Sequence, residues 1–123
     1  KGVGAIIVTD AMAAAGAPPG RYTIGDLTVE VGRDRVVRQP GQPHFAGSAL
    51  TMADAVSNAV RFTGIALSEA WDAASNRPRA LLQRAGARMR AGGSGTVLAR
   101  SEAGALQIER VIRGRKTLWQ RAG

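Results

Sequence analysis

The apolar run at residues 5–8, followed closely by Asp10, constrains the possible fold more than any other feature. Residues 5–8 are Ala-Ile-Ile-Val, so the run lacks the polar alternation of a strand with one solvated face. Such runs are typical of strands covered on both faces, as in the parallel sheets of α/β proteins. Asp10 then lies just past the carboxyl end of the strand, where α/β barrels place catalytic side chains. The sequence predicts an α/β fold with a buried strand over residues 4–8; the alternative is a small α+β domain in which this strand pairs with later ones.

A loop of small residues leads into the clearest helix signal of the chain. Residues 45–52 are Phe-Ala-Gly-Ser-Ala-Leu-Thr-Met, and Thr51 and Asp54 have the spacing of a capping box. Apolar residues then recur three and four positions apart, as they do on one face of a helix. Gly64 follows, and glycine commonly ends helices. The pattern predicts a helix over residues 51–63.

The rest of the chain contains further strand and helix signals. Residues 22–24 and 27–31 alternate in polarity around Gly25-Asp26, which predicts a β-hairpin. Apolar spacing predicts a helix around residues 67–74 and a short one that starts near Pro78. Three further strands are predicted at residues 95–99, 106–112 and 117–120.

Three of these segments carry a resemblance to a known family. Residues 8–12, 20–22 and above all 45–52 resemble N-acetylglucosamine-6-phosphate deacetylases, which are metal-dependent amidohydrolases. The implied fold class is α/β: the last β/α unit of a metal-dependent-hydrolase (β/α)₈ barrel plus C-terminal strands of a small β-sandwich. That fold would be incomplete in this chain, because such a barrel needs roughly 250 residues and the chain has 123.

The resemblance also implies how the chain divides. Residues 1–85 would form the C-terminal end of the barrel, with a β-hairpin insert at about 20–38, and residues 86–123 would form the sandwich strands. Most of the barrel would then precede Lys1. We expect the missing N-terminal part of the barrel to be a partner of this chain, and we expect a homo-oligomer.

The activity implied by the resemblance is removal of the acetyl group from N-acetylglucosamine 6-phosphate. Asp10 matches the family's catalytic carboxylate, which moves a proton from the attacking water to the departing amine. Phe45, Ala46 and Gly47 match the loop that contacts the sugar. Judged by composition alone, an aspartate after an apolar strand is more often a turn former or a helix cap.

The resemblance implies a divalent metal, zinc or iron, in the complete enzyme. We expect this chain alone to bind none, because it has no cysteine and only one histidine, His44. A catalytic zinc site generally needs three protein ligands. His44 lies in a proline-rich loop, after Pro40 and Pro43, and is predicted to be a solvated loop residue.

The net charge of +8 is concentrated in the C-terminal third. From Arg77 onward the chain has eleven basic and two acidic residues, whereas the preceding part is near neutral. A solvated basic face is the favoured interpretation. The less favoured alternatives for this basic region are a nucleic-acid-binding module and an interface with an acidic part of the missing half. For the chain as a whole, the alternative to a deacetylase is a non-catalytic fragment of the same ancestry that binds a sugar phosphate or a partner. The sequence has no run of about 18 apolar residues and no signal-peptide cleavage motif, so we expect a cytoplasmic protein without membrane contact.

Overall fold

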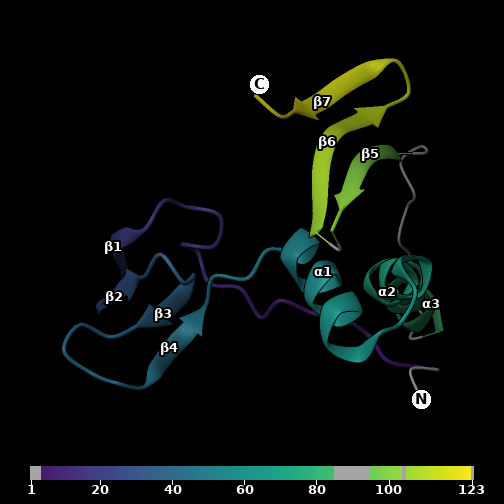
Figure 1. Cartoon of the computed structure of the whole chain (residues 1–123). Coiled ribbons are helices and arrows are strands. Elements are labelled where there is room, and N and C mark those ends of the chain that lie inside the picture. Colours follow the sequence, from purple (N-terminus) through teal and green to yellow (C-terminus); the bar gives the residue numbers. More distant parts are fainter. Residues whose placement is uncertain (1–3, 85–94, 104, 123) are drawn as a thin grey trace. The chain divides into compact units, whose positions relative to one another are not determined.

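The computed structural model describes residues 4–84, 95–103 and 105–122 (Figure 1). Within these ranges the chain forms two compact units. One unit is Val8–Ala55, and the other combines the residues up to Ile7 with those from Val56 onward. The division into residues 1–85 and 86–123 stays a prediction. No helix in the described ranges is long and apolar enough to cross a membrane.

The unit Val8–Ala55 is built on a four-stranded antiparallel meander. The strands are β1 (Gly20–Ile24), β2 (Leu27–Val31), β3 (Val36–Arg38) and β4 (Phe45–Ser48), and they lie in the order β1-β2-β3-β4. The predicted hairpin is confirmed, because β1 pairs with β2 from Gly20↔Val31 to Ile24↔Leu27. Gly25 in its turn has a φ of +58°, which glycine adopts without steric cost.

One face of this meander carries a small core. Val29 and Val37 are fully buried, and Val31 is 3% exposed. Ala14 and Ala49 complete the buried cluster from outside the strands. The loop before β1 is fixed by the Tyr22 hydroxyl, which donates a hydrogen bond of 2.5 Å to the Pro18 carbonyl.

The predicted helix over 51–63 is confirmed as α1 (Met52–Thr63). The Thr51 hydroxyl accepts a hydrogen bond of 3.2 Å from the Asp54 amide and donates one of 2.7 Å to the Asp54 carboxylate. At the other end, the Gly64 amide bonds to the Val60 carbonyl at 2.9 Å, with a φ of +71° at Gly64. The helix therefore begins and ends where its capping residues predict.

Two more helices and a second sheet follow. The helices are α2 (Leu67–Ala74) and α3 (Asn76–Arg84), and the strands are β5 (Gly95–Glu102), β6 (Ala105–Arg113) and β7 (Lys116–Gln120). The strand order is β5-β6-β7, all antiparallel. Leu106 on β6 packs with Val56 of α1 and Ala70 of α2. Its amide donates a hydrogen bond of 2.8 Å to the Ser57 hydroxyl.

The predicted strand over residues 4–8 is wrong for the described structure. Residues 5–10 have no assigned secondary structure, and Val8 is 69% exposed. The Ile7 amide bonds to the Ala73 carbonyl at 3.0 Å, and the Arg77 guanidinium bonds to the Ala5 carbonyl at 3.2 Å. A parallel strand takes its backbone hydrogen bonds from neighbouring strands, and here a helix end and an arginine supply them instead.

Candidate active site

The structure brings the Asp10 segment and the Phe45–Ser48 segment together. Ala11 forms an isolated parallel β-bridge with Ser48. Next to it, the Met12 amide donates a hydrogen bond of 2.9 Å to the Ser48 carbonyl. Asp10 precedes one side of this bridge and Gly47 precedes the other. The residues singled out from the sequence thus belong to one place in the fold, inside a single compact unit.

Asp10 has an unusual backbone conformation. Its φ is +48°, in the left-handed region that non-glycine residues seldom occupy, although aspartate tolerates it better than most. Its side chain is exposed. Such conformations cost of order 1–3 kcal/mol and gather at functional sites. Asp10 thus lies just before the bridge, exposed to solvent.

The three residues of the predicted sugar-contact loop differ in their surroundings. Phe45 is 74% exposed, whereas Ala46 is half-buried and packs against the buried cluster of the meander. Gly47 is exposed with a φ of +135°. A Cβ atom at Gly47 would lie only 3.1 Å from the Met12 sulfur. An apolar ring and an open backbone are therefore presented on the side away from the core.

Residues 48–54 connect this place to α1 through local hydrogen bonds. The Ser48 hydroxyl accepts a hydrogen bond of 3.2 Å from the Leu50 amide. Asp54, which caps α1 with Thr51, also forms an ion pair with Arg35 from the β2–β3 turn. Sequence reasoning missed this arginine, because nothing in the sequence pairs a turn residue with a helix start nineteen positions later. Arg35 itself has a left-handed φ of +58°.

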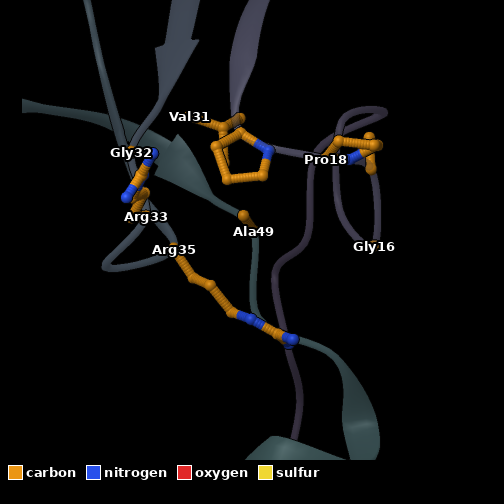
Figure 2. Close-up of a pocket in the computed structure, with 9 residues that line it drawn as sticks. Gly16, Pro18, Val31, Gly32, Arg33, Arg35 and Ala49 are labelled. Atoms are coloured by element: carbon orange, nitrogen blue, oxygen red, sulfur yellow. The ribbon is translucent and has the colours of Figure 1, made fainter.

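A hollow of about 550 Å³ lies beside the meander (Figure 2). Gly16 and Pro18 lie on one side of it in Figure 2, and Gly32 and Arg33 lie on the other. Neither Asp10 nor the loop Phe45–Gly47 lines it. The hollow is therefore adjacent to the candidate site along the chain, through Ala49, but is not the place where the predicted residues gather.

The described residues do not fit a metal centre. Within residues 4–84, 95–103 and 105–122, no group of three or more His, Cys, Asp and Glu side chains is close enough to hold an ion. His44 is exposed. The carboxylates with a changed pKa lie outside the candidate site. For example, hydrogen bonds from Arg38 and from the Val36 amide hold the pKa of Asp34 below its ordinary value of 3.8.

Solved structures similar to this chain define a class of enzyme. N-acetylglucosamine-6-phosphate deacetylase from Thermotoga maritima matches with a TM-score of 0.68 and 29% identity, over 98% of this chain and 32% of that one. A variant of the Mycobacterium smegmatis enzyme, in complex with N-acetyl-D-glucosamine-6-phosphate, matches with a TM-score of 0.65 and 28% identity, over 91% of this chain and 30% of that one. Both are deacetylases of N-acetylglucosamine 6-phosphate.

Curated relatives agree with this class. N-acetylglucosamine-6-phosphate deacetylase of Vibrio furnissii is 38% identical over 72 residues, which are 58% of this chain and 18% of the relative. N-acetylgalactosamine-6-phosphate deacetylase of Escherichia coli O157:H7 is 42% identical over 77 residues, which are 63% of this chain and 20% of the relative. A putative enzyme of that second kind from Escherichia coli K12 matches with the same identity, over 45% of its length. No protein-family profile matches.

The resemblance to N-acetylglucosamine-6-phosphate deacetylases is therefore confirmed, over part of their length. The chain spans between 18% and 45% of the curated relatives and about a third of the solved ones. The fold is correspondingly a partial α/β structure with two small sheets.

Proposed function

We propose that this chain is the C-terminal part of a hydrolase that removes the acetyl group from N-acetylglucosamine 6-phosphate. The observation that carries the proposal is the β-bridge between Ala11 and Ser48, which joins the Asp10 segment to the Phe45–Gly47 segment. The named relatives and solved neighbours, all amino-sugar-phosphate deacetylases, support the same reaction. In this proposal α1 is the last helix of the barrel, and β5–β7 belong to a small β-sandwich completed by residues outside this chain.

Asp10 is assigned the proton transfer of the reaction. Hydrolysis of the acetamide adds water to the carbonyl carbon, breaks the C–N bond and releases acetate and a free amine. The attacking water must lose a proton, and the leaving nitrogen must gain one. An exposed carboxylate can do both in turn, as general base and then general acid.

Phe45, Ala46 and Gly47 are assigned to contact with the sugar. Gly47 is exposed and has a positive φ that glycine adopts without steric cost, so its backbone is open to a ligand on the side away from Met12. The exposed ring of Phe45 offers an apolar surface beside it. The divalent metal of the complete enzyme, zinc or iron, would polarise the carbonyl and would be held by residues outside this chain. A cytoplasmic location and assembly as a homo-oligomer belong to the same proposal.

The test measures acetate release from N-acetylglucosamine 6-phosphate by the full-length protein. Replacing Asp10 with Asn keeps the shape and removes the base, so kcat should fall by about 10²- to 10⁴-fold with KM little changed. Gly47→Ala should raise KM, because the methyl group meets the Met12 sulfur and strains a backbone with a positive φ, which displaces the loop that contacts the sugar. Asp26→Asn, at the exposed tip of the β1–β2 hairpin, is the matched control and should keep normal kinetics. If Asp10→Asn keeps more than about a tenth of kcat, the general-base role is untenable.

A second candidate substrate is N-acetylgalactosamine 6-phosphate. It is favoured by one observation: two of the curated relatives are named for that sugar, and at 42% they are more identical to this chain than the Vibrio enzyme is. The two substrates differ only in configuration at C4. The ratio of kcat/KM for the two sugars, measured on one full-length preparation, decides between them.

A further inference from the structure

We propose that Met12 is a positioning residue, which fixes Asp10 relative to the strand β4 that carries Gly47. The inference rests on the proposed function, because it concerns the reaction in which Asp10 takes part. It assigns a role to a side chain that itself contacts neither the acetyl group nor the sugar.

The backbone of Met12 provides the first half of the argument. Its amide donates a hydrogen bond of 2.9 Å to the Ser48 carbonyl, directly beside the Ala11–Ser48 bridge. Asp10 is two residues earlier, next to the bridged Ala11, and has a φ of +48°. The direction in which the carboxylate leaves the backbone is therefore set by how firmly residues 11 and 12 are held to β4.

The side chain of Met12 provides the second half. It is partly buried and packs against the buried cluster that includes Val29 and Val37. Its sulfur atom also fills the space next to Gly47, 3.1 Å from where a Cβ atom would lie. Methionine is unbranched and adaptable, so it can fill an irregular gap of this kind. The side chain thus lies between the core of the meander and the backbone of Gly47.

Loss of this side chain would loosen Asp10 without removing any group that touches the substrate. Without the thioether, residues 10–12 can shift relative to β4. A displacement of about 1 Å of a catalytic group can cost on the order of 10²-fold in rate. The exposed surfaces of Phe45 and Gly47 would remain, so sugar binding should change little.

The experiment compares variants of the full-length enzyme with N-acetylglucosamine 6-phosphate as substrate. Met12→Ala should lower kcat by about 10- to 100-fold, with KM within about threefold of normal. Met12→Leu keeps the volume and should restore kcat to within about threefold. Met52→Ala is the matched control, since Met52 is a methionine of the same compact unit, 40% exposed at the start of α1. Normal kcat in Met12→Ala overturns the inference, as does an equal loss in Met52→Ala.

A double-mutant comparison separates positioning from general destabilisation. If Met12 acts through Asp10, adding Met12→Ala to Asp10→Asn should lower kcat by less than about threefold further. If the two substitutions instead lower kcat by independent factors that multiply in the double variant, the inference is overturned. If Met12→Ala does not fold, Met12→Val still fills part of the core but withdraws from Gly47, and a normal kcat in that variant counts against Met12. Failure of the proposed function looks different, because Asp10→Asn itself then stays active.

Discussion

The two sheets of this protein have the same architecture and very different interiors. The meander β1–β4 buries Val29, Val31 and Val37 on one face within its own compact unit. The sheet β5–β7 is also a simple antiparallel arrangement, but all residues of β5 and β7 are exposed, and Leu106 is the one buried residue of β6. The first sheet therefore has a core within the described residues, whereas most apolar side chains of the second sheet are exposed to solvent or only half-buried.

Three apolar residues of the second sheet lie in register. Val97 pairs with Val111, and Val111 pairs with Trp119, so the three residues form a row across β5, β6 and β7. Val97 is 40% exposed and Trp119 is 48% exposed. Neighbouring residues in register share one face of a sheet. In the proposed enzyme such a face is an inner face of the β-sandwich.

The largest expected effect is a difference in core stability between the two sheets. Val29→Ala should lower the free energy of unfolding of the meander by about 2 kcal/mol, from lost burial and a residual cavity. Val97→Ala on β5 should cost less than about 0.5 kcal/mol. Urea unfolding measures both, with fluorotyrosine at the sole tyrosine, Tyr22, reporting on the meander, and the two tryptophans, Trp71 and Trp119, reporting on the other unit. Equal losses of unfolding free energy in Val29→Ala and Val97→Ala would contradict the difference in burial between the two sheets.

The second prediction concerns self-association of the 123-residue chain. Exposed apolar surface drives association, so we expect oligomers or aggregates by light scattering. Trp119→Lys should weaken association about tenfold, which is about 1.4 kcal/mol. Leu27→Lys, at the tip of the hairpin in the first sheet, is the control and should change little, although Leu27 is also exposed, at 42%. A monomeric chain with a cooperative melt contradicts the prediction.

The third prediction tests the start of α1, which lies inside the unit Val8–Ala55. Thr51→Ala removes the hydroxyl that accepts from the Asp54 amide. Loss of a threonine cap costs about 1 kcal/mol. Because Thr51 and Asp54 lie in the same unit as Tyr22, the unfolding midpoint reported by Tyr22 should fall by more than that reported by the tryptophans. Thr51→Ser, which keeps the hydroxyl, should behave like the native chain.

The smallest expected effect is a dependence of folding stability on pH, which arises from one carboxylate in each compact unit. Hydrogen bonds from Asn76 and Arg77 hold the pKa of Asp72 below 3.8, as Arg38 does for Asp34. A lowered pKa means that each carboxylate stabilises the fold above pH 3.8 and loses this contribution as the pH falls through the folded-state pKa. The Tm difference between the native chain and Asp72→Asn should therefore shrink below pH 3.8. The same should hold for Asp34→Asn in the meander. A difference that grows in acid contradicts the assignment.

Local elements could be predicted from the sequence because their causes are local. The capping residue Thr51 and the terminator Gly64 define α1, and the Gly25-Asp26 pair defines the first hairpin. The error at residues 4–8 has a different origin. A parallel strand depends on partners distant in the sequence, and an apolar run does not say whether those partners are present.

The candidate site was predictable only in part. The resemblance supplied Asp10 and the loop Phe45–Gly47, and the structure places them beside one bridge; their roles stay predictions. Neither spacing nor composition could reveal the contact of Met12 with Gly47 or the ion pair of Arg35 with Asp54. Both are tertiary contacts, made by side chains that look ordinary in the sequence.

The strand order of the meander has a kinetic consequence. Every strand of β1–β4 pairs with its neighbour along the chain, so each pairing closes only a short loop, and such topologies fold quickly. The bridge between Ala11 and Ser48 encloses the entire meander. Its closure costs more chain entropy and should come last. A newly synthesised chain would then gain a folded scaffold first, and Asp10 and Gly47 would meet only in the final step of assembly.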